Sequence, residues 1–137
     1  MAEAYETKAA GIRILVVDDD LYARQAMMEG LRSRGYQVKG AEDGLQALQQ
    51  LRREPFNLVI TDIQMPRMDG VALLREICRH DYAPVIVQTT LVDSYLQDVL
   101  RGAGASGVLV KGESATEIVR LVENLCRRTD ESSSQRG

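Results

Sequence analysis

The sequence has little of what several common protein classes depend on. Its 137 residues include only two cysteines, Cys78 and Cys126, which are far too few for a disulfide scaffold. No apolar run approaches the ~20 residues that span a bilayer, and the acidic stretch 1–8 lacks the apolar centre of a secretory signal. The net charge of −3 lacks the basic excess of an intrinsic nucleic-acid or anionic-membrane surface. We therefore predict a cytoplasmic protein that binds neither nucleic acid nor a membrane directly.

What the sequence does contain is typical of one ordinary globular domain. The hydrophobic fraction is 45% and the charged fraction 27%. A chain of this length has room for one domain that buries about two thirds of its unfolded surface. We expect a flexible lead-in over residues 1–11, a folded domain over 12–127, and a polar tail over 128–137 that is disordered or a truncated linker.

Short apolar runs alternate with segments of helical periodicity along the chain. The predicted strands are 12–17, 36–40, a run that begins at Leu58, 85–88 and 107–110. The predicted helices are 20–34, 43–54, one from about Gly70, 92–102 and one opened by a capping box at Ser114. Four strands are continuous apolar runs, whereas 36–40 alternates apolar and polar residues like an edge strand. This pattern predicts an α/β fold, a single doubly wound, flavodoxin-like parallel sheet of order 2-1-3-4-5 with five helices.

The stretch 58–70 places a carboxylate in an unusual position. An apolar run leads directly to Asp62, and the following Pro66 and Asp69–Gly70 favour a turn over a continuing strand. Burial makes the charged form of such a carboxylate costly unless it has partners. We therefore expect partners for Asp62 at the ends of the other strands.

Chemically useful side chains follow four of the five predicted strands at their carboxyl ends. They are Asp18, Asp19, Asp62, Thr89 and Lys111. Taken singly, each has an ordinary explanation: a helix cap, a β-branched strand residue or a surface lysine. Ligands of doubly wound sheets bind at the carboxyl ends of the strands. The joint occurrence therefore predicts one pocket that contains all five side chains.

The residue types in this pocket indicate a chemistry. At ~4 Å and an effective dielectric near 20, each pair of like charges costs about 4 kcal/mol, so three carboxylates need a counter-charge. Oxygen ligands without histidine or cysteine favour Mg²⁺ over zinc. An anion such as a phosphoryl group would face the cation, the Lys111 amine and the Thr89 hydroxyl. An aspartate beside the metal is a competent nucleophile toward phosphorus.

Four segments of the sequence resemble the receiver domain of two-component response regulators. They are 14–20 (ILVVDDD), 61–66 (TDIQMP) with 68–70 (MDG), 87–89 (VQT), and 104–107 (GASG) leading to Lys111. The resemblance extends over about residues 11–127. Each segment alone is a weak signal, but together they are highly specific.

The resemblance implies a phosphoacceptor site with a bound Mg²⁺. Asp62 would accept a phosphoryl group from the phosphohistidine of a sensor histidine kinase or a phosphotransfer protein. Asp19, Asp62 and the backbone carbonyl of Gln64 would ligate the metal directly. Asp18 would act through a metal-bound water.

The resemblance also implies a switch rather than an enzyme. Such a switch at most catalyses its own phosphorylation and dephosphorylation. Thr89 and Lys111 would bind the phosphoryl oxygens. Their movement would change the surface of the fourth helix, fifth strand and fifth helix. An unknown output domain or target protein would recognise this surface, and a phosphorylation-dependent homodimer is compatible with it.

The sequence departs from the family pattern at three places. Val108 stands where the family usually has an aromatic residue, and its small, stiff side chain cannot make the rotamer change that accompanies signalling. Gly112 replaces the proline that usually follows Lys111, which predicts a trans peptide bond. Thr90 is bulkier than usual, and Leu91 offers no polar side chain to guide water, which predicts slow self-dephosphorylation.

Two other functions compete with the phosphorylation switch. The Asp-x-Asp within 18–20 is also found in aspartate-based phosphatases, but these need a second acidic motif and usually a cap insertion, which this sequence does not offer. The other alternative is a receiver-like interaction module that works without phosphorylation. The complete acidic set and Lys111 argue against it, while Val108 is compatible with it.

Overall fold

The computed structural model describes residues 11–63, 69–90, 93–111 and 117–125. Several predictions concern positions outside these ranges: the lead-in before residue 11, Gln64, Leu91, the bond from Lys111 to Gly112, the capping box at Ser114 and the tail. They stay predictions.

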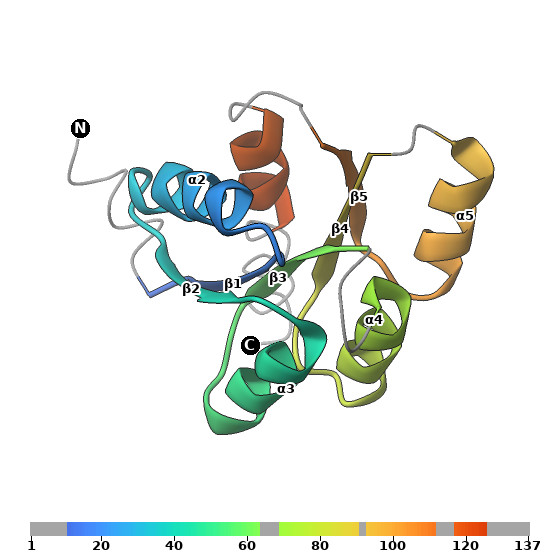
Figure 1. The fold of residues 1–137 in the computed structure, drawn as a ribbon, viewed down its shortest axis with the longest axis horizontal. Helices are drawn as coiled ribbons and strands as arrows, with labels where there is room; N and C mark the ends of the chain where they lie inside the picture. The colour runs from blue at the N-terminus through green and yellow to red at the C-terminus, as the bar shows by residue number, and fades with distance from the viewer. Residues whose placement is uncertain (1–10, 64–68, 91–92, 112–116, 126–137) are drawn as a thin grey trace, which may run out of the picture.

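The centre of the molecule is a parallel sheet (Figure 1). Its strands are β1 (Arg13–Val17), β2 (Gln37–Ala41), β3 (Leu58–Asp62), β4 (Val85–Thr89) and β5 (Gly107–Val110). Their order is β2-β1-β3-β4-β5, and all neighbouring pairs are parallel. The predicted fold class and strand order are confirmed.

Helices connect the strands. They are α2 (Leu21–Arg32), α3 (Gly44–Arg53), α4 (Gly70–Arg79) and α5 (Ser94–Gly102), and residues 117–125 form a further helical segment. An aspartate caps the amino end of each of the four named helices, namely Asp20, Asp43, Asp69 and Asp93. Helix α4 begins at Gly70 as predicted, and α2, α3 and α5 begin one or two residues later than predicted, because a cap residue itself is not helical. None of the described helices is long and apolar enough to cross a membrane.

The helices cover the sheet in two layers (Figure 1). Helix α2 and the segment 117–125 pack on one face, against side chains such as Ile14 and Ile60. Helices α3, α4 and α5 pack on the other face, against Leu15 and Val59. Successive strand residues point to opposite faces, so a strand between two helix layers is buried on both faces. All five residues of β3 and of β4 are buried.

Strand β5 corrects one expectation. Its apolar sequence predicts burial on both faces, but its residues alternate between buried and partly buried, with Val108 among the partly buried ones. The reason is its place at the outer edge of the sheet opposite β2, where fewer neighbours cover it. Val108 packs against the cluster on the α3, α4 and α5 face.

Candidate functional site

The carboxyl ends of β1 and β3 bring three aspartates together. Asp18 and Asp19 follow β1, and Asp62 is the last residue of β3. One carboxylate oxygen from each lies within 4.8 Å of the others. The two strands are direct neighbours, with Val17 aligned on Thr61. The predicted meeting of the acidic doublet with Asp62 is therefore present in the structure.

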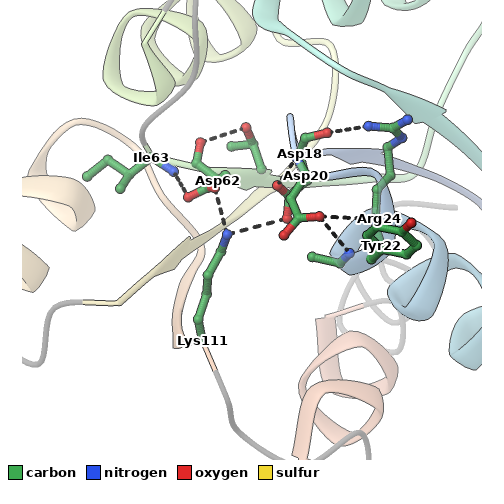
Figure 2. Close-up of polar contacts among 9 residues, drawn as sticks. Asp18, Asp20, Tyr22, Arg24, Asp62, Ile63 and Lys111 are labelled. Carbon is green, nitrogen blue, oxygen red and sulfur yellow. Dashed lines mark hydrogen bonds and ion pairs between the residues drawn. The ribbon is translucent and has the colours of Figure 1, made fainter.

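Asp62 is held by two donors, one on each carboxylate oxygen (Figure 2). The backbone N–H of Ile63 donates to Oδ1 at 2.8 Å, and the Lys111 ammonium donates to Oδ2 at 2.7 Å. The side chain is buried, with 7% of the residue exposed. These contacts stabilise a charged carboxylate in a largely dry position.

Lys111 links both halves of the acidic cluster. Its Nζ lies 2.7 Å from Asp62 Oδ2 and 3.4 Å from Asp18 Oδ2. Burial alone would lower the pKa of Lys111, but the hydrogen bond to Asp62 and the charge of Asp18 outweigh it, so the pKa is raised. The ammonium is therefore charged at neutral pH. The backbone N–H of Lys111 donates to the Thr89 carbonyl at 2.7 Å, which ties the ends of β4 and β5 together.

Asp18 is almost completely buried, with 2% exposed. Burial raises the pKa of its carboxyl above the ordinary value, against the opposing effects of the Asp20 N–H and the Lys111 ammonium. The Asp20 N–H donates to Asp18 Oδ1 at 3.0 Å. Asp20 also caps α2, accepting from the backbone N–H of Tyr22 and of Ala23.

The donor set fits a hard divalent cation. The three carboxylates outnumber the single ammonium that contacts them within the described part of the chain, so the cluster keeps an excess of negative charge. Every member of this cluster offers oxygen, the ligand that Mg²⁺ prefers. Asp19 is exposed and gives the cluster an open side.

One contact was not anticipated from the sequence. The guanidinium of Arg24, on the first turn of α2, donates to the backbone carbonyl of Asp18 at 2.6 Å (Figure 2). The only available signal was an arginine six positions after the first aspartate of the doublet, and many helices carry an arginine there for solubility.

Fold and site together define a flavodoxin-like α/β domain with an acidic, lysine-bearing edge. The sequence model of one protein family, the response regulator receiver domain, matches residues 14–123. The chain therefore belongs to this family. Receiver domains are regulators rather than classical enzymes, and they bind Mg²⁺ at an acidic pocket. Response regulators are phosphorylated by histidine kinases and act on output targets.

The curated relatives that the chain matches are longer than the chain itself. The chain is 36% identical over 124 residues to the probable transcriptional regulator ycf27 of Porphyridium aerugineum, covering 89% of this chain and 51% of that protein. It is 33% identical over 126 residues to the transcriptional regulatory protein PdtaR of Mycobacterium tuberculosis, covering 91% and 62%. The chain thus spans between about half and two thirds of these two relatives.

Solved structures of similar fold include response regulators and their receiver domains. The receiver domain of the Francisella response regulator 1452 superimposes with a TM-score of 0.83 at 27% identity, covering 87% of this chain and 99% of that one. TrrA from Thermotoga maritima, solved in complex with Mg(2+)-BeF, gives a TM-score of 0.76 at 34% identity, covering 83% and 98%.

Proposed function

We propose that Asp62 is the phosphoacceptor of this receiver domain, with a sensor histidine kinase or a phosphotransfer protein as the donor. The observation that carries the proposal is the geometry around this carboxylate. Oxygens of Asp18 and Asp19 lie within 4.8 Å of it, and the Lys111 ammonium lies at 2.7 Å. We propose that the folded receiver domain extends over residues 12–127. We also propose that the protein is cytoplasmic.

The transfer forms one bond and breaks another. A carboxylate oxygen of Asp62 attacks the phosphorus of a phosphohistidine. The phosphorus–nitrogen bond breaks, and its electron pair returns to the imidazole ring of the donor. The product is an acyl phosphate on Asp62 and a free histidine. The Ile63 N–H, at 2.8 Å from Oδ1, helps to orient the carboxylate for this attack.

Asp18, Asp19, Asp62 and the carbonyl of Gln64 are proposed to hold Mg²⁺. When bound, the metal supplies positive charge that offsets the charge of the phosphoryl oxygens. The Asp18 carboxylate is kept in place by the Asp20 N–H at 3.0 Å. Asp19 is exposed and free to complete the ligand set from the solvent side.

Lys111 and Thr89 are proposed to bind the phosphoryl oxygens. The Lys111 ammonium already contacts Asp62 at 2.7 Å, so a short movement brings it onto the new group. Thr89 ends β4 beside it, and the two residues share a backbone hydrogen bond of 2.7 Å. Their rearrangement would change the surface of α5, β5 and the segment 117–125, where an output domain, a target protein or a second copy binds. Because Val108 is small, we propose that coupling proceeds through Thr89 and loop movement.

Exposure to a small-molecule phosphodonor tests the proposal directly. Intact mass should show one phosphoryl adduct on the wild type with Mg²⁺, and none without Mg²⁺ or in Asp62→Asn. The matched control is Asp81→Asn, in the loop between α4 and β4, which should be phosphorylated normally. A metal-independent adduct, or one retained in Asp62→Asn, would contradict the proposal. A complete lack of adduct would favour the phosphorylation-independent interaction module.

A further inference from the structure

We propose that Arg24 is a positioning residue that holds the Asp18–Asp19 doublet in the orientation needed for cation binding. The inference rests on the proposed cation site. Within the described part of the chain, Arg24 makes no hydrogen bond or ion pair with the carboxylates of the proposed cation site.

Arg24 contacts the backbone and not the carboxylates. Its Nη1 donates to the Asp18 carbonyl at 2.6 Å (Figure 2). A guanidinium placed on the carboxylates would occupy the lone pairs that a cation needs. Placed on the carbonyl, it fixes the peptide unit that joins Asp18 to Asp19 and leaves the carboxylate oxygens of both residues for a cation.

Arg24 is bonded to the chain before and after Asp19, and the first of these two bonds uses its side chain. Its side chain holds the Asp18 carbonyl, and its backbone N–H donates to the Asp20 carbonyl at 2.9 Å. Asp18 has further supports: its N–H donates to the Ala41 carbonyl at 3.1 Å, and its carboxylate accepts from the Asp20 N–H at 3.0 Å. Asp19 itself is exposed. The direction of its side chain therefore depends on the peptide unit between Asp18 and Asp19, which the Arg24 guanidinium holds.

Gly40 provides the space through which Arg24 reaches Asp18. An added Cβ at Gly40, in edge strand β2, would lie 3.2 Å from Arg24 Cδ and 2.8 Å from Met28 Sδ. The Met28 sulfur can move, but a shift of Arg24 Cδ displaces the guanidinium at the end of the same side chain. A glycine at this position of β2 thus lets the α2 side chains lie closely across the strand.

Arg32 on the same helix offers a matched control. Its Nη2 donates to the Val38 carbonyl at 2.8 Å, so it makes the same kind of bond from α2 to a backbone carbonyl, but away from the aspartates. Arg24→Met and Arg32→Met each remove one such bond and one positive charge. Only Arg24→Met is expected to disturb the cation site.

The experiment measures the affinity for Mn²⁺, a spectroscopic substitute for Mg²⁺, by electron paramagnetic resonance in the full chain. Arg24→Met should weaken Mn²⁺ binding about 10-fold, the lower end of what indirect supports of metal ligands contribute. Arg24→Lys should also weaken it, because the ammonium keeps the charge but not the guanidinium geometry. Arg32→Met should bind as the wild type does. Urea unfolding of each variant reports stability separately.

The sign of the effect distinguishes positioning from simple charge. If Arg24 acted only through its charge, Arg24→Met would bind Mn²⁺ more tightly, because a nearby positive charge would be gone. Tighter or unchanged binding would overturn the proposal. Gly40→Ala gives a second test that keeps Arg24. As a single substitution it should weaken Mn²⁺ binding, and combined with Arg24→Met it should add little further weakening. A wild type that binds no Mn²⁺ would instead overturn the cation site itself.

Discussion

Lys111 and Asp62, 49 positions apart in the sequence, form an ion pair of 2.7 Å at the carboxyl edge of the sheet. The same ammonium lies 3.4 Å from Asp18. Lys111 thus neutralises part of the charge that a cation would otherwise neutralise. A cation at this site would compete electrostatically with the lysine for the same carboxylates, and both would fit only because the carboxylates outnumber the ammonium.

Lys111→Met should separate the two effects of this ammonium. Without a cation the three carboxylates lose their counter-charge, so the variant should be less stable than the wild type by about 1–3 kcal/mol at low salt. Its Mg²⁺ affinity should rise, because the competing charge is gone. Urea unfolding with and without Mg²⁺ checks both statements. A variant destabilised equally with and without Mg²⁺ would show that Lys111 acts through packing alone.

Mg²⁺ should stabilise the folded domain by binding the native acidic cluster. At a concentration 100 times the dissociation constant the gain is about 2.7 kcal/mol. Asp19→Asn should remove most of it, since Asp19 is an exposed member of the cluster with little other structural role. Thermal unfolding in Mg²⁺ against NaCl of equal ionic strength measures the gain. Undiminished stabilisation in Asp19→Asn would exclude Asp19 as a ligand.

Gly70 lies too close to the backbone of Asp62 and Ile63 for any side chain. A Cβ there would contact the Asp62 carbonyl and lie 2.5 Å from Ile63 Cα. Gly70→Ala should therefore destabilise the domain by about 1–3 kcal/mol and lower phosphorylation by shifting Asp62. Gly30→Ala is the control: apart from its chain neighbours and the nearby backbone of α2, its Cβ meets no described atom within 4 Å, and α2 should gain about 0.5–1 kcal/mol. Urea unfolding and intact mass compare the two.

Glu54 should make stability depend on pH on the acid side. Hydrogen bonds from Lys39 and Arg13, at 2.6 and 2.7 Å, hold the pKa of Glu54 below its ordinary value of 4.5. A lowered pKa in the folded state contributes stability above the unfolded value, and this contribution is lost as the pH falls through the folded value.

Glu54→Gln should consequently unfold at a lower temperature than the wild type at pH 7. The difference should shrink as the pH falls below 4.5, where the wild type also loses the charge. Glu29→Gln, on the exposed side of α2, serves as the control and should show no such convergence. A pH-independent difference for Glu54→Gln would mean that the two ion pairs contribute nothing.

The sequence alone determined the order of elements, the strand order and the aspartates, threonine and lysine at the strand ends. Apolar runs and helical periodicity are local properties of the sequence. The rule that parallel strands end at one edge of the sheet then predicts that the residues following these strands lie close together. Asp20 as a helix cap was predictable for the same reason, because a cap depends on residues only two or three positions away.

Only the tertiary structure decided how close those side chains come and what supports them. The incomplete burial of β5 depends on which strand has no outer neighbour. The contact from Arg24 to Asp18, the space at Gly40 and the close approach of Gly70 to Ile63 depend on how loop, strand and helix backbones pack, which local sequence patterns do not give. Sequence periodicity identifies which face of a helix or strand a residue occupies. The exact distances between side chains on that face are set by the packing of all their neighbours at once.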